Sequence, residues 1–116
     1  MADDFFEAKI RNVAGAVVID LTGEINGQAE RGLIEVYTSA EHMNPSSIVL
    51  NFSKVNYINS TGIALIVGLL ARARKSHRRL AVIGLSDHYV EIFQITRLVD
   101  FMSIYPDEAS VRVGIA

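Results

Sequence analysis

The feature of this sequence that most restricts its fold is a strand pattern followed closely by a helix pattern. Residues 47–52 form a short, nearly continuous apolar run, which is typical of a strand covered on both faces. Four apolar residues then recur at helical spacing and predict one buried stripe: Ile63, Ile66, Val67 and Leu70. Between the two patterns stands Ser60-Thr61-Gly62, where the free N–H groups of a helix start are expected to gather.

The chain before this segment predicts a hairpin and a helix. Residues 5–10 and 16–21 read as strands, and a turn at 12–15 joins them into an antiparallel hairpin. The segment 23–27 is expected to end the second strand, and Asn26 to cap the following helix. That helix has one buried stripe and ends at Asn44-Pro45. The stripe consists of Ala29, Leu33, Val36, Tyr37 and Ala40.

The chain after it continues the alternation. Residues 80–85 read as a buried strand, and Ser86 is placed to cap a third helix, with Asp87 favourable for its dipole. Residues 101–105 predict a last short strand, and Pro106 precedes a terminal helix that starts near Asp107. The expected fold is α/β: one domain over residues 1–116, with a mixed sheet of four to five strands, an N-terminal antiparallel hairpin and three to four helices.

Composition excludes several classes of site. The 116 residues carry a formal net charge of −2, which gives no reason to expect nucleic acid as a partner. The chain has no cysteine, and its three histidines lack metal-ligand spacing, so neither a disulfide nor a metal or other cofactor is expected. The acidic start shows no cleavable signal pattern, and the longest apolar run, 63–71, is too short to span a bilayer. We therefore expect a cytoplasmic protein without direct membrane insertion.

The helix predicted after residues 47–52 contains two features that each allow a structural and a functional interpretation. Ser60 is either a simple helix cap or a place where a phosphate is attached. Leu65 and Leu69 are either a partner surface or, as we favour, packed under a neighbouring helix. No catalytic base accompanies Ser60, so no catalytic residue and no enzyme activity are expected.

A run of basic residues ends the same helix, where cations complement the helix C-terminus, and we interpret it as a solvated end. The run consists of Arg72, Arg74, Lys75, His77, Arg78 and Arg79.

Four blocks of sequence, in this order, resemble the STAS domain family and specifically its bacterial anti-sigma factor antagonists. The blocks are Leu21-Thr22-Gly23-Glu24-Ile25-Asn26, Ile48-Val49-Leu50-Asn51-Phe52, Ile58-Asn59-Ser60-Thr61-Gly62-Ile63, and Thr96-Arg97-Leu98-Val99-Asp100 with Ile104-Tyr105-Pro106. The resemblance implies a single STAS domain that switches partners. In that family the unphosphorylated antagonist binds an anti-sigma factor that is also a serine kinase of the histidine-kinase ATPase fold, which releases the sigma factor.

The resemblance also implies residue roles. The kinase phosphorylates a serine that matches Ser60, and a metal-dependent serine phosphatase reverses the reaction. The residues expected to contact the partner are Glu24, Asn26, Asn59, Thr61, Gly62, Leu65 and Leu69.

The chain departs from the family pattern at four positions. Asn26, Asn51 and Asn59 stand where the family commonly has Asp, which retains hydrogen bonding but removes charge. Fewer carboxylates near Ser60 would ease the repulsion of a phosphate. Arg97 stands where the family often has Gly, which is expected to alter one helix end.

Two other functions are compatible with the same domain. It could be a STAS subunit of a membrane transport complex, docked on an ATPase or permease without phosphorylation. It could also be a scaffold protomer of a stress-sensing assembly, which would form large oligomers.

Overall fold

The computed structural model describes residues 5–13 and 15–115. The acidic residues 1–4, Ala14 of the predicted turn and Ala116 lie outside the described residues. The elements follow in the order β1 (Glu7–Val13), β2 (Ala16–Ile25), the 3₁₀ turn η2 (Gly27–Ala29), α1 (Glu30–His42), β3 (Ser47–Ile58), α2 (Ser60–Lys75), β4 (Arg79–Ile83), α3 (Asp87–Ile95), the 3₁₀ turn η3 (Leu98–Asp100), β5 (Ser103–Tyr105) and α4 (Glu108–Ile115).

The five strands form one mixed sheet in the order β1-β2-β3-β4-β5. β1 pairs antiparallel with β2 from Glu7↔Thr22 to Val13↔Ala16, and the other pairs are parallel. The predicted hairpin, mixed sheet and final strand and helix are therefore confirmed.

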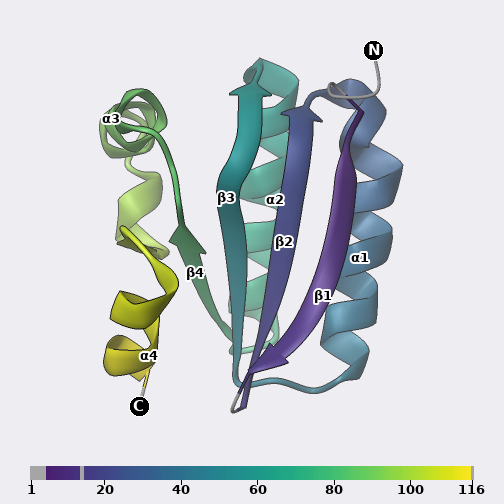
Figure 1. The fold of residues 1–116 in the computed structure, drawn as a ribbon, viewed down its shortest axis with the longest axis vertical. Coiled ribbons are helices and arrows are strands. Elements are labelled where there is room, and N and C mark those ends of the chain that lie inside the picture. Colours follow the sequence, from purple (N-terminus) through teal and green to yellow (C-terminus); the bar gives the residue numbers. More distant parts are fainter. Residues whose placement is uncertain (1–4, 14, 116) are drawn as a thin grey trace.

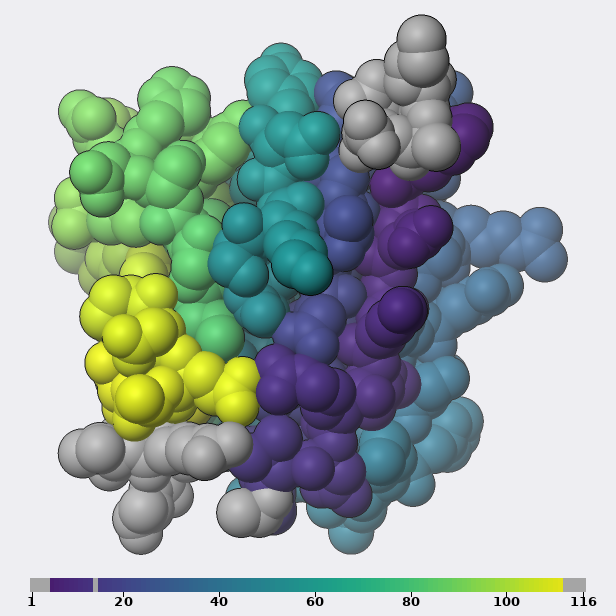
Figure 2. Space-filling view, viewed as in Figure 1, coloured from purple at the N-terminus to yellow at the C-terminus, as the bar shows by residue number. Residues whose placement is uncertain are grey.

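The two faces of the sheet are covered unequally. Helices α1 and α2 lie behind the sheet in Figure 1, and their buried stripes join the strands in one large apolar core. On the other face α4 packs on a smaller cluster that includes Val18, Val49 and Val111. Figure 2 shows that the remaining part of this face, on β1 to β3, stays at the surface beside α4.

Two strands run further than their sequence patterns predict. β2 continues past the predicted range 16–21 and through Gly23, which has a φ of +94°, to end at Ile25, inside the segment 23–27 that was expected to end it. β3 continues past Phe52 to Ile58. The β2–β3 register shifts twice, between Asp20 and Thr22 and between Gly23 and Glu24, as β-bulges do. These irregularities disturb the alternation of buried and exposed side chains. The apolar pattern of the sequence therefore did not predict the last residues of β2 and β3.

Helix α2 buries a face rotated from the predicted one. Its buried residues are Gly62, Ile66, Leu69, Leu70 and Ala73. Val67, predicted to be buried, is 41 % exposed, whereas Leu69 is only 2 % exposed. Residues 60–71 contain no charged side chain, so apolar residues occur around the whole circumference and do not select one face.

Helix ends agree with the sequence in most cases. Asn26 caps the 3₁₀ turn η2 that leads into α1, whereas the prediction made it the cap of the helix itself, and α1 ends at His42 before Asn44 and Pro45. Ser86 occupies the N-cap position of α3 but its side chain makes no capping hydrogen bond, which corrects the predicted role. Arg97 follows α3 with a φ of +66°, in the left-handed region that favours glycine.

The basic run at the end of α2 is engaged with the fold. Arg72 pairs with Glu41 of α1. Arg78 donates to the carbonyl oxygens of Pro45 and Glu41, and the Arg74 guanidinium lies over the Phe101 ring. These contacts join helix ends and loops, which supports a structural role for the run.

Candidate functional site

Ser60 is the first residue of α2, is exposed, and is separated from the end of β3 by Asn59 alone. Because β2 and β3 are parallel, their carboxyl ends meet at the same edge of the sheet. The Asn59 N–H donates to the carbonyl oxygen of Ile25, at 3.2 Å, which ties the start of α2 to the end of β2. The candidate site therefore lies where the carboxyl ends of neighbouring parallel strands meet helix starts, a common position for binding sites in α/β sheets.

Asn59 supplies the cap of α2. Its Oδ1 accepts from the Gly62 N–H at 2.8 Å, and its carbonyl oxygen accepts from the Ile63 N–H at 2.9 Å. The N–H groups of Ser60 and Thr61 belong to the first turn of α2, where backbone N–H groups have no acceptor within the helix. Ser60 thus carries its hydroxyl at a helix start that retains two hydrogen-bond donors.

The turn after β2 lies beside the same helix start. Asn26 Oδ1 accepts from the Gln28 N–H at 2.9 Å. A Cβ placed on Gly27 would lie 3.7 Å from Thr61 Cγ2, which puts the turn in contact with the first turn of α2. Glu24, half-buried, stands opposite Tyr57 in the β2–β3 register. The structure thus brings Glu24, Asn26 and Asn59 to the edge that carries Ser60.

Gly62 allows the close approach of these two elements. A Cβ at this position would lie 2.0 Å from the carbonyl oxygen of Ile25, closer than any real side chain could remain. The glycine is therefore required by the neighbouring strand of the same chain, and it is buried.

Two residues expected at the partner surface need correction. Leu69 belongs to the core beneath α2, so its side chain is not accessible to a partner. Leu65 is half-buried and packs against the same core. The packing interpretation of this pair is therefore the one that the structure supports, because the helix is rotated from the predicted orientation.

Three residues near the site were missed by sequence reasoning. Tyr57 is 50 % exposed at the end of β3, and Val67 is exposed on α2. The Tyr89 hydroxyl of α3 accepts from the buried Ile58 N–H at 2.9 Å and so holds the strand end before Ser60. No local pattern marks them, because the bulges in the β2–β3 pairing and the uncharged helix hide their orientation.

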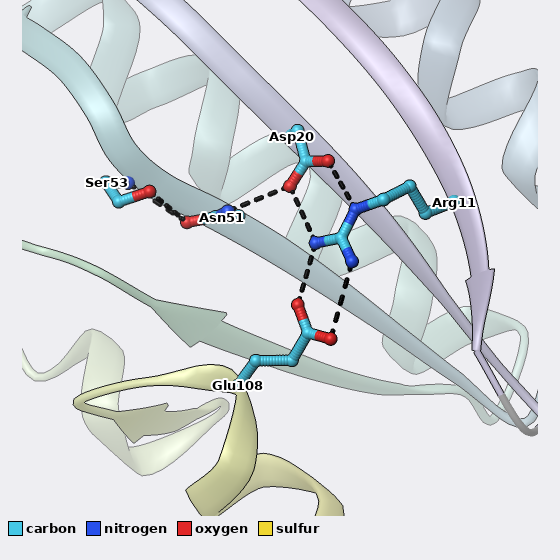
Figure 3. A network of polar contacts seen from close by, with 5 residues as sticks. All are labelled: Arg11, Asp20, Asn51, Ser53 and Glu108. Atoms are coloured by element: carbon cyan, nitrogen blue, oxygen red, sulfur yellow. Dashed lines mark hydrogen bonds and ion pairs between the residues drawn. The ribbon is translucent and has the colours of Figure 1, made fainter.

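Asn51 lies in a different polar network, on the open face of the sheet (Figure 3). Its Nδ2 donates to Asp20 Oδ1 at 2.8 Å, and its Oδ1 accepts from the Ser53 N–H and hydroxyl. Hydrogen bonds from Arg11 hold the pKa of the Asp20 carboxyl below its ordinary value, although burial opposes this shift. Asn51 is therefore a partner of Asp20 and not part of the Ser60 edge.

The described residues show no cluster of His, Asp or Glu that could hold a metal ion. Among them there is also no helix with the length and apolar character needed to cross a membrane.

A family model and a curated relative both match most of this chain. The STAS domain family matches residues 7–111. An anti-sigma-B factor antagonist of Staphylococcus aureus is 30 % identical over 102 residues, covering 88 % of this chain and 84 % of that protein.

Solved structures show the same fold. An anti-sigma factor antagonist from Mycobacterium paratuberculosis superimposes with a TM-score of 0.83 at 17 % identity, covering 96 % of this chain and 94 % of that one. The Bacillus cell fate determinant SpoIIAA in its phosphorylated form gives a TM-score of 0.70 at 21 % identity, with 91 % and 97 % covered. At these identities the likeness concerns the fold alone.

Proposed function

This chain belongs to the STAS domain family, and from that premise we propose that it is an anti-sigma factor antagonist switched by phosphorylation of Ser60. The unphosphorylated form binds an anti-sigma factor that is also a serine kinase of the histidine-kinase ATPase fold. Phosphorylation of the Ser60 hydroxyl releases the anti-sigma factor, and a metal-dependent serine phosphatase restores binding. The chain acts by binding its partner and not by catalysis, from the cytoplasm. The observation that carries the proposal is the exposed Ser60 at the start of α2.

The position of Ser60 separates the effect on folding from the effect on binding. A phosphate adds about −1.5 to −2 charges at neutral pH. The N–H groups of the first turn stabilise such a charge, so the domain itself stays folded. A partner surface closing over the phosphate would bury it without compensation, which is costly. Binding is therefore lost while the fold is retained.

The two asparagines at the site favour the phosphorylated state. In each, the side-chain oxygen is already used in a capping bond to a backbone N–H, from Gln28 for Asn26 and from Gly62 for Asn59. The amide NH₂ groups therefore remain as donors, and neither side chain adds negative charge next to Ser60. A phosphate meets less repulsion here than it would beside two carboxylates.

The surface that meets the partner extends from this edge along α2. Glu24, Asn26, Asn59 and Thr61 form its polar part. Exposed uncharged residues of α2 continue it: Ala64, Val67, Gly68 and Ala71. A helix face without charge lets a partner pack closely without desolvating ion pairs, which suits an interface.

The test is a binding experiment from native cell extract with four baits: wild type, Ser60→Ala, Ser60→Glu and the control Ser86→Glu. Ser86 is also exposed at a helix start, so its variant adds the same charge elsewhere. We expect wild type, Ser60→Ala and Ser86→Glu to recover an ATPase-fold serine kinase, and Ser60→Glu to lose it. Equal recovery by Ser60→Ala and Ser60→Glu would contradict the switch. A transporter or a large assembly in the catch would favour one of the other two functions.

A further inference from the structure

The C-terminal helix covers an apolar strip on the sheet face opposite α1 and α2. The strip consists of Val18, Val49, Ala81 and Ile83, each at most 3 % exposed. They come from the three central strands, and Val111 of α4 completes the cluster. Figure 1 shows α4 alone at the lower left, away from the two helices behind the sheet. Val13 and Tyr105, both partly buried, also pack against the cluster, and α4 is the helix that covers it.

The first half of α4, residues 108–111, contributes one buried apolar side chain to this contact. Among its side chains that the structure describes, Val111 is the one that is buried. A helix of eight residues is not stable in isolation, so α4 stays helical only while it is docked.

An ion-pair network fastens the first turn of α4 to the hairpin (Figure 3). Arg11 Nη2 donates to Glu108 Oε1 at 2.7 Å, and Nη1 donates to Oε2 at 3.4 Å. The same guanidinium donates to both carboxylate oxygens of Asp20, which fixes its position on the sheet. These groups are partly exposed, so the network contributes modestly and can be broken without disturbing the large core.

We propose that α4 is a releasable cover, which undocks from the folded domain as a unit, with the Arg11–Glu108 pair controlling how often it opens. Opening exposes the strip to solvent while the core behind the sheet stays closed. The opening therefore needs less free energy than global unfolding, as in other local openings of folded proteins. This property does not depend on Ser60 or on any partner.

Thiol labelling tests the proposal directly, because the chain contains no cysteine. Val49 and Leu50 are adjacent in β3, are 1 % and 0 % exposed, and belong to the clusters on opposite faces of the sheet. We expect the thiol of Val49→Cys to react with iodoacetamide at least about tenfold faster than that of Leu50→Cys under native conditions. Leu50→Cys removes more apolar volume, so any destabilisation acts against this result. Ala81→Cys provides a second thiol on the strip.

A second change tests the contribution of the ion pair to docking of α4. Glu108→Gln added to Val49→Cys is expected to raise the labelling rate about threefold, because the pair exists only while α4 is docked. The rate for Leu50→Cys, whose labelling needs global unfolding, should rise by no more than the same factor. Glu35→Gln, which breaks the exposed Arg31–Glu35 pair on α1, is the matched control and should change neither rate. Equal labelling of the Val49→Cys and Leu50→Cys thiols, or an unchanged rate for Val49→Cys after Glu108→Gln, would overturn the proposal.

Discussion

Gly62 at the start of α2 packs directly on the carbonyl group of Ile25 at the end of β2, with space for a hydrogen atom but not for a methyl group. This contact fixes the distance between the two segments that carry Asn26 and Ser60. Gly68, nearly two turns further along the same helix, faces open space, and a Cβ there would meet no neighbouring atom within 4 Å.

The two glycines therefore predict opposite effects of the same substitution. Gly62→Ala should lower the free energy of unfolding by about 2–3 kcal/mol, because β2 or α2 must shift. Gly68→Ala should raise it by about 1 kcal/mol, because alanine favours the exposed helix interior. Urea unfolding of both variants checks this, and a stabilising Gly62→Ala would show that the close approach is absent in solution.

Arg97 occupies a backbone conformation suited to glycine. Arg97→Gly should stabilise the domain by about 1 kcal/mol, since a left-handed φ costs a residue with a Cβ about that much. The variant also loses the exposed Arg97–Asp100 pair, whose contribution is small. Arg97→Ala loses the pair but keeps the Cβ and should not stabilise. If thermal unfolding shows the same midpoint for both variants, the strain argument is wrong.

The Asp20 network predicts a pH dependence. The pKa of Asp20 in the folded state is lowered from 3.8, first by the hydrogen bond from Arg11. Its stabilising contribution is therefore complete well above pH 3.8 and is lost as the pH falls through the lower folded-state value. Wild type should be more stable than Asp20→Asn at neutral pH, with the difference shrinking in acid. A difference that stays constant down to about pH 2 would exclude this linkage.

The asparagine beside Ser60 can be tested without any kinase, on protein with phosphoserine incorporated at position 60. Asn59→Asp keeps a capping oxygen but adds a charge next to the phosphate, so the second pKa of the phosphate should rise by about half a unit to one unit. Phosphorus NMR titration measures this value. Asn51→Asp, which places its charge beside Asp20, is the control and should leave the second pKa of the phosphate unchanged. Equal shifts in the two variants would rule out a local effect of Asn59.

Tyr89 predicts a structural link to the site from α3. Tyr89→Phe removes the acceptor of the buried Ile58 N–H and should cost about 1–3 kcal/mol. Amide exchange at Ile58 should accelerate more than exchange at Val49, which lies in the same strand. Uniform acceleration along β3 would indicate general destabilisation instead.

The sequence alone determined the order of strands and helices, the hairpin, the cap at Asn26 and the position of Ser60 at a helix start. These features depend on residues close together in the chain, whose apolar spacing and capping side chains specify local structure. The unusual helix end at Arg97 was also expected, from the resemblance to a family that often has glycine at this position.

The tertiary structure decided which face of α2 is buried, where the β2–β3 pairing bulges and which partner each polar side chain finds. Leu69 is buried and Val67 is exposed, the reverse of the predicted stripe. An uncharged helix acquires its orientation only from the sheet and the helix against which it packs. Arg11 and Glu108 meet although 97 positions separate them, and Asn51 pairs with Asp20 on a neighbouring strand. Such contacts depend on how distant segments are brought together, and no local pattern of residues contains that information.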